Sequence, residues 1–205
     1  MDDKSRRLFS FLESLHGDLY PETQSELHSN ISRQVIERCV ADGTLRRGDR
    51  LLDMGCGQGV ALALFRRHGI DAIGITMGED YRVCRDAGYD VREMDFSFLD
   101  FEDATFDFVW CRHALEHSVF PLFTLHEIRR VLRPGGRAYV EVPAPDTIVR
   151  HENNPNHYSV LGMTMWLSLF DKAGFTLVGK QDIVFRLKVG PDAYHSFLLR
   201  NGNDQ

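Results

Sequence analysis

The sequence of 205 residues lacks any long apolar run, and no stretch approaches the roughly 20 consecutive apolar residues that cross a membrane. Its first residues, MDDKSRRLFSFLESLHGD, also lack the uninterrupted apolar core of a secretory signal peptide. We therefore expect a cytoplasmic protein that has no membrane anchor and no membrane partner.

Basic runs are absent as well. Lysine and arginine number 24 against 30 acidic residues, which gives a formal net charge of −6, and no basic run is longer than a pair. Binding of nucleic acid without sequence preference requires a concentrated cationic surface, so we expect no nucleic-acid partner.

Cysteine is scarce, and the four that occur (Cys39, Cys56, Cys84 and Cys111) form no C-x-x-C pair. That spacing is typical of redox and zinc motifs, and its absence favours ordinary reduced thiols.

What the chain has instead is an alternation of short apolar runs with helical segments, beginning at residue 49. This alternation predicts βαβ units, and hence an α/β fold with a doubly wound, mostly parallel sheet of seven strands. The last two strands are joined by the short segment 188–192, so we expect them to pair antiparallel. We expect strands at 50–54, 72–76, 90–94, 106–111, 137–143, 175–185 and 194–201, and helices at 60–68, 79–87, 122–132 and 162–172.

The first 48 residues have a different pattern. They predict two helices, at 5–15 and 24–42, separated by the irregular segment 16–23. The first helix carries a wide apolar face. We expect residues 1–48 to form an N-terminal helical cap on a ligand-binding domain at 49–205, the two making one compact unit.

The most informative segment is LLDMGCGQG, residues 51–59. An apolar strand leads to Asp53, and Gly55, Gly57 and Gly59 then alternate up to the start of a helix. Glycines at such a turn permit positive φ angles and close approach of a ligand at the carboxyl edge of the sheet. Asp53 would repel a pyrophosphate but attract a ligand that carries ammonium and sulfonium groups. A nicotinamide-dependent oxidoreductase on the same fold, which usually has the spacing G-x-G-x-x-G, is the disfavoured alternative.

Two further segments extend the pattern: FDFVWCRHALEHS at 106–118 and LRPGGRAYVEVP at 132–143. With the glycine-rich turn they resemble, in order and spacing, the motifs of the class I S-adenosylmethionine-dependent methyltransferases that act on small molecules. The resemblance implies a Rossmann-like methyltransferase fold, S-adenosylmethionine as cofactor and methyl transfer to an oxygen, nitrogen or carbon nucleophile. It leaves open a cofactor-binding partner protein without catalysis, and either a monomer or a homodimer.

The resemblance also implies cofactor contacts. Thr76 ends the second strand, where this family usually has an acidic residue that binds the ribose hydroxyls; a similar ending occurs in the cyclopropane fatty acid synthase group. Glu79 or Asp80 supplies the missing carboxylate, or else both simply favour a helix N-terminus. The residues implied at the cofactor are Asp53, Gly55, Cys56 and Gly57 at its methionine part, Gly59 for close helix packing, Thr76 at the ribose, Met77, Asp95 and Phe96 at the adenine, and Cys111 and Arg112 after the fourth strand.

The segment CRHALEH, residues 111–117, is expected to border the reacting methyl group. His113, His117 and His157 are the candidate catalytic residues, with His117 acting either as a general base or in a structural role under the cofactor. Some quinone-pathway O-methyltransferases of this class bind a divalent metal with acidic and histidine residues here, which makes His113, Glu116 and His117 candidate ligands if this segment is helical. Because L-E-H also occurs in members without metal, we expect no metal.

The polar loop at 150–161 is expected to cover the substrate, because long loops in small domains are often functional. Its acid or base candidates are His151, His157 and Tyr158.

Overall fold

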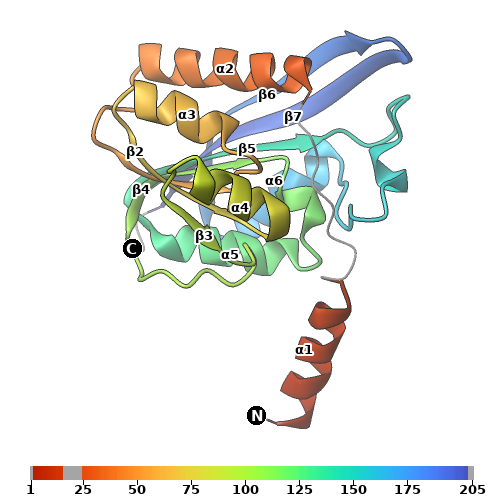
Figure 1. Ribbon diagram of the computed structural model, residues 1–205. Coiled ribbons are helices and arrows are strands. Elements are labelled where there is room, and N and C mark those ends of the chain that lie inside the picture. The colour runs from red at the N-terminus through yellow and green to blue at the C-terminus, as the bar shows by residue number, and fades with distance from the viewer. Residues whose placement is uncertain (1, 16–24, 203–205) are drawn as a thin grey trace.

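The computed structural model describes residues 2–15 and 25–202, in which seven strands form one sheet in the order β3-β2-β1-β4-β5-β7-β6 (Figure 1). The first five strands run parallel, whereas β7 is antiparallel to both β5 and β6. The prediction of a doubly wound, mostly parallel sheet is confirmed. The strands are β1 (Arg50–Met54), β2 (Asp71–Thr76), β3 (Val91–Glu93), β4 (Phe106–Arg112), β5 (Leu132–Pro143), β6 (Phe175–Leu187) and β7 (Gly190–Asn201).

Helices cover both faces of this sheet (Figure 1). Adjacent residues of β1 belong to different cores: Leu51 packs in the core under α2 and α3, and Leu52 in the core under α5 and α6. Apolar residues are therefore adjacent in this central parallel strand, because both of its faces are covered. The helices are α1 (Asp3–Leu15), α2 (Glu26–Ala41), α3 (Val60–Arg67), α4 (Gly78–Asp86), α5 (Pro121–Val131) and α6 (Met163–Lys172), with short 3₁₀ turns η2 (Leu115–His117) and η3 (His151–Asn153).

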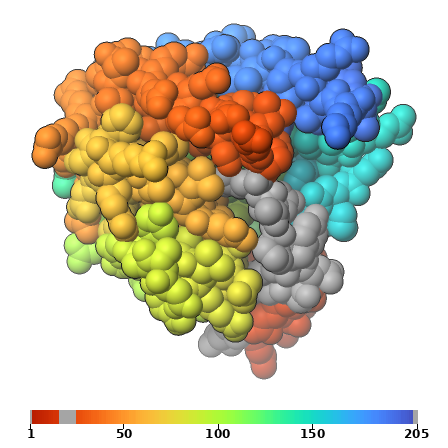
Figure 2. All heavy atoms as spheres, turned by 45° about the horizontal axis from the view of Figure 1, so that its top comes forward, coloured from red at the N-terminus to blue at the C-terminus, as the bar shows by residue number. Residues whose placement is uncertain are grey.

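The N-terminal helices differ in how they are attached. Ser25 caps α2 by accepting a hydrogen bond from the backbone of His28, and α2 lies between α3 and the β6–β7 hairpin (Figure 2). In contrast, α1 projects from the rest of the molecule and buries Leu12 alone (Figure 1). The predicted irregular segment 16–23 and the predicted helix start at Gln24 lie outside the described residues. The division at residue 48 stays a prediction.

Two local predictions need correction. The strand expected at 137–143 begins earlier, because β5 starts at Leu132, which pairs with Phe106 before the chain bulges out at Gly135 and pairs again from Arg137. The helical turn that would align two histidines after β4 does not form, because His113 has a φ of 51° and only Leu115–His117 makes a 3₁₀ turn.

Across the described residues, the helices are too short or too polar to span a membrane.

Candidate functional site

A pocket of about 400 Å³ opens at the carboxyl ends of the parallel strands. Residues at or just after the ends of β1, β2, β3 and β4 form one wall, which is where α/β sheets bind ligands. The opposite wall comes from α1, α2 and the loop before α6 through Leu12, Leu15, His28, Asn156 and Tyr158. The predicted residues that line the pocket are Gly55, Gly57, Thr76, Met77, Glu79, Asp80, Asp95, Phe96, Arg112, His113, His117 and Tyr158.

The glycine-rich turn after β1 needs its glycines for two separate reasons. Gly55, Gly57 and Gly59 have φ angles of 69°, 50° and 82°, a region that other residues rarely adopt. A Cβ atom at Gly55 would also lie 2.8 Å from the Cβ of Ala114, which lines the same pocket. The turn therefore keeps backbone rather than side chains next to the cavity.

Asp53 lies behind this turn, with a side chain that is almost fully buried. The residue is 2% exposed, and its Oδ2 atom has no hydrogen-bond partner in the described part of the chain. Burial raises the pKa of Asp53 to about 8. A buried carboxylate oxygen without a partner suits a cationic group that reaches it directly or through water.

Three other predicted cofactor residues also lie behind the pocket wall. Cys56 and Cys111 are buried, and the Cys84 thiol donates to the carbonyl of Gly57 at 3.1 Å. A Cβ at Gly59 would come within 3.1 Å of Cys84, so this glycine allows α3 and α4 to approach each other. These residues shape the turn from behind rather than line the cavity.

The end of β2 presents Thr76 together with two acidic residues. Glu79 forms an exposed ion pair with Arg82 at 3.2 Å. Asp80 differs, because its Oδ1 atom is buried without a hydrogen-bond partner among the described residues and burial raises its pKa. Both acids line the pocket, but Asp80 is the one with an unused oxygen.

Behind the other end of the pocket lies a network of buried charges. The Nε atom of Arg112 lies 2.7 Å from Glu141, which is fully buried on β5 and also accepts a hydrogen bond from the hydroxyl of Tyr139. His113 lies between two carboxylates, with Nδ1 3.2 Å from Glu116 and Nε2 3.2 Å from Glu141. Arg112 and His113 line the pocket, so the network forms part of its wall.

The opposite charges in this network shift the pKa values of Glu116 and His113. Burial opposes ionisation of Glu116, but its hydrogen bond to His113 lowers the pKa of the carboxyl. The pKa of His113 is raised against burial and the Arg112 charge, because Glu116 and Glu141 both stabilise the imidazolium. The two carboxylates therefore favour the protonated form of His113, and that form cannot accept a further proton.

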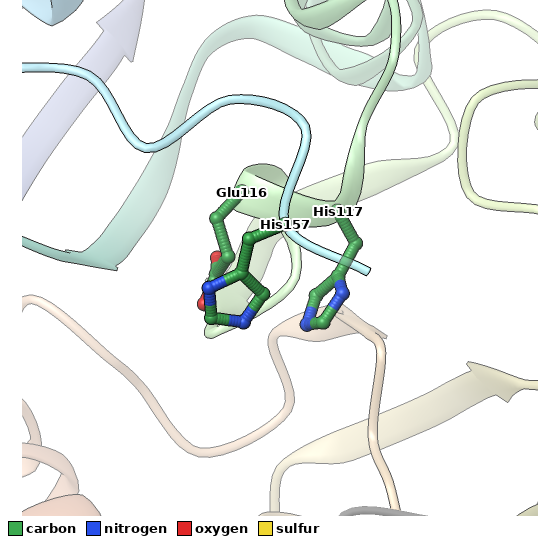
Figure 3. A group of neighbouring side chains, drawn as sticks. All are labelled: Glu116, His117 and His157. Carbon is green, nitrogen blue, oxygen red and sulfur yellow. The ribbon is translucent and has the colours of Figure 1, made fainter. Parts of the chain in front are cut away.

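The side chains of His117 and His157 lie next to that of Glu116 (Figure 3). One ligand atom from each of these three side chains lies within 4.8 Å of the other two. The group of possible metal ligands is therefore Glu116, His117 and His157, whereas the sequence indicated His113, which contacts Glu116 but does not belong to this group. His117 lines the pocket, and the rings of His117 and His157 pack edge to face with centroids 4.7 Å apart.

Sequence reasoning missed two members of the site. His28 on α2 lines the pocket, and its Nε2 shares a hydrogen bond with the hydroxyl of Tyr194 on β7. Burial lowers the pKa of His28 to about 4, so it is neutral near pH 7. Glu141 lies within the apolar run of β5 and was passed over, although a carboxyl inside a buried strand is itself a signal of a compensated site.

Comparison with known proteins supplies further findings. A family model described as "Methyltransferase domain" matches residues 24–180. The 27-O-demethylrifamycin SV methyltransferase of Amycolatopsis mediterranei is 31% identical over 147 residues, which are 65% of this chain and 54% of that protein. The sterol 24-C-methyltransferase ERG6 of Saccharomyces cerevisiae is 34% identical over 128 residues, 57% of this chain and 33% of that protein.

A solved structure of geranyl diphosphate methyltransferase in complex with SAM has the same fold. Its TM-score is 0.70 at 17% identity, and the match covers 85% of this chain and 86% of that one. In the curated relatives named above, this chain spans about half of the first protein and about a third of the second.

Proposed function

Because the family model covers most of its length, this chain belongs to the class I S-adenosylmethionine-dependent methyltransferases, and we propose that it methylates an oxygen, nitrogen or carbon atom of a small molecule. Its cofactor is S-adenosylmethionine. The relatives include an O-methyltransferase and a C-methyltransferase, so the family leaves the type of acceptor atom open.

The observation that supports the proposal best is the glycine-rich turn with a partnerless carboxyl behind it. Gly55 and Gly57 expose backbone to the pocket, and Asp53 holds a buried oxygen without a partner in the described residues. The methionine part of the cofactor carries the ammonium group that this carboxyl would bind. The residues present therefore fit the cofactor.

We assign the adenosine part to the ends of β2 and β3. Thr76 and Asp80 are the proposed acceptors for the ribose hydroxyls, because Asp80 has an unused oxygen and Glu79 is already paired with Arg82. Asp95 and Phe96 line the same part of the pocket and are the proposed adenine contacts. Asp95 also accepts a hydrogen bond from the backbone of Ser97 at 2.8 Å, which fixes the turn.

The cofactor supplies a methyl group that its sulfonium charge already activates, so the chain mainly has to align the acceptor and exclude water. The proposed acceptor end contains His117 and Tyr158. Nδ1 of His117 lies 2.9 Å from the carbonyl of Asn156 and therefore carries the ring proton, which leaves a lone pair on Nε2. His113 and His157 are proposed to position this end of the site.

Release of S-adenosylhomocysteine tests the proposal. The full chain would be incubated with S-adenosylmethionine and a panel of small hydroxyl, amine and carbon acceptors, and both products followed by mass spectrometry. We expect release that depends on one acceptor class, with that acceptor gaining one methyl group. Binding of the cofactor without release for any acceptor would favour a non-catalytic binding protein, and binding of NADH alone would reject the proposal.

The pH dependence of cofactor affinity follows from Asp53. With a pKa of about 8, this carboxyl is protonated in the free protein at neutral pH, and an ammonium group binds its ionised form. The affinity for the cofactor is therefore expected to rise with pH up to about 8. The rise is at most about tenfold per pH unit, because binding releases one proton from Asp53. Above that pH the ammonium group of the ligand begins to lose its own proton.

Calorimetric titration of S-adenosylhomocysteine between pH 6 and 8.5 measures this dependence, with Asp53→Asn as the comparison. The variant is expected to bind S-adenosylhomocysteine more weakly, and its affinity is expected not to rise with pH. The stability of the unliganded protein depends on pH in the opposite direction. The Asp53 carboxyl ionises near 3.8 in the unfolded chain and near 8 in the folded one, so stability falls as pH rises between these values. A wild-type affinity that is constant over this range would contradict the role of Asp53.

A further inference from the structure

Glu116, His117 and His157 come together from two segments that are distant in sequence (Figure 3). The loop that carries His157 is fixed to η2 by the backbone amides of Tyr158 and Ser159, which both donate to the carbonyl of Glu116 at 2.8 and 2.9 Å. The hydrogen bonds of the backbone therefore hold the three side chains together before any ligand arrives.

In both His117 and His157, the Nδ1 atom forms a hydrogen bond with a backbone carbonyl. Nδ1 of His117 lies 2.9 Å from the carbonyl of Asn156, and Nδ1 of His157 lies 2.9 Å from the carbonyl of His151. A carbonyl only accepts, so each Nδ1 carries the proton and each Nε2 has a lone pair. Histidines that bind a metal usually have their second nitrogen fixed in this way.

Glu116 adds an oxygen that lacks a partner. The residue is 1% exposed, its Oε1 atom lies 3.2 Å from Nδ1 of His113, and its Oε2 atom has no hydrogen-bond partner within the described ranges. Buried carboxylate oxygens are normally satisfied by a donor or a cation. His113 fixes one oxygen of the carboxylate and leaves the other for a ligand.

A cation would displace the contact between Nε2 of His157 and the side-chain amide of Asn154, at 3.2 Å. That amide belongs to the same loop, so a rotation of its side chain suffices. The ligand atoms lie up to 4.8 Å apart, whereas atoms about 2.1 Å from a tetrahedral ion lie roughly 3.4 Å apart, so the side chains would have to rotate inward on binding.

We propose that Glu116, His117 and His157 bind one divalent transition-metal ion, of the zinc or manganese class, at the wall of the pocket. Two neutral imidazoles and one carboxylate are a ligand set that such ions accept, with positions left for water or substrate. This differs from the expectation of no metal, and it uses His157 in place of His113.

The proposed metal site lies next to the part of the pocket that we assign to the acceptor. His117 lines the pocket, so an ion bound to it would lie beside the cavity and not on the outer surface. A divalent ion lowers the pKa of a hydroxyl group that coordinates it, so an acceptor hydroxyl would lose its proton without a separate base. This consequence, unlike the metal site itself, rests on the proposed methyl transfer.

Binding of Co²⁺ to the full chain, purified without a histidine tag and treated with chelator, tests the proposal. Calorimetry and visible absorption are expected to show one ion per chain, displaced by Zn²⁺. Substitution of a ligand, by His157→Ala or Glu116→Gln, is expected to weaken Co²⁺ binding by roughly 100-fold. This is the largest loss of metal affinity that is typical for removal of a residue that hydrogen-bonds to a ligand. His126→Ala, which removes an exposed histidine of α5, is the matched control and is expected to bind like the wild type.

Three results would overturn the proposal: no Co²⁺ binding to the wild type at micromolar concentrations, equal binding by His157→Ala, or the near-ultraviolet absorption of a cobalt–thiolate bond, which would place the ion on a cysteine. Circular dichroism shows whether each variant is folded, and Glu116→Gln preserves side-chain shape if His157→Ala does not fold. A parallel titration with S-adenosylhomocysteine separates the two proposals, because a wild-type chain that binds the cofactor but not Co²⁺ would reject the metal site alone.

Discussion

Replacement of Gly55 by alanine is expected to lower the affinity for S-adenosylmethionine by about 100-fold or more. The residue has a φ of 69°, which costs a residue with a side chain roughly 1–3 kcal/mol. The added Cβ would also lie 2.8 Å from the Cβ of Ala114, so one of the two segments has to shift. Both segments line the pocket, and a shift of either changes the part of the site that we assign to the methionine end.

Gly88→Ala is the matched control for this change. Gly88 has a φ of 72°, but a Cβ there meets nothing within 4 Å, so the variant has the backbone strain without the collision. We expect cofactor affinity within about threefold of the wild type, because Gly88 follows α4 and does not line the pocket. Calorimetric titration of folded protein measures both variants. Equal losses would mean that strain alone, and not the close approach at Ala114, determines the effect.

Replacement of Arg112 by methionine is expected to lower the free energy of unfolding by about 3–5 kcal/mol. Arg112 contacts Glu141 at 2.7 Å, and the two side chains are 6% and 0% exposed. Removal of one member of a buried ion pair leaves the other charge without full compensation in a medium of low polarity, which is the main cost. His113 and Tyr139 continue to contact Glu141 and moderate the loss.

Urea denaturation followed by circular dichroism measures this loss, and two variants interpret it. Arg82→Met removes a pair with Glu79 in which the side chains are 67% and 58% exposed, so its expected cost is below about 1 kcal/mol. The double variant Arg112→Met with Glu141→Met is expected to recover part of the stability, because apolar side chains can replace a buried pair. A single variant as stable as Arg82→Met would show that the network contributes little.

Much of the fold was predictable because its determinants are local. Central strands such as β1 and β4 contain consecutive apolar residues, at 51–52 and 108–111, which is typical of parallel strands covered on both faces, and glycines end the helices between them. The direction of β7 followed from the short connection to β6. Local patterns were less informative where the backbone departs from regular geometry, as at His113 and at the bulge in β5.

The glycine-rich turn was recognisable for the same reason. Asp53 and the three glycines are contiguous, and the chemistry they support depends on one strand-to-helix connection. The environment of Asp53 was not predictable, because its burial and its unpaired oxygen depend on neighbouring strands that pack around it.

The acceptor end depended on contacts between distant segments. The residues from Arg112 to His117 suggested catalytic histidines on a helix, but the left-handed backbone at His113 sends its ring to Glu141 on β5, while His117 meets His157 from a loop 40 residues later in the chain. Sequence therefore specified the fold class, the family and the cofactor, because these follow from short contiguous motifs. The partners of each histidine were specified by packing, because a side chain's charge and hydrogen bonds depend on which distant strands and loops surround it.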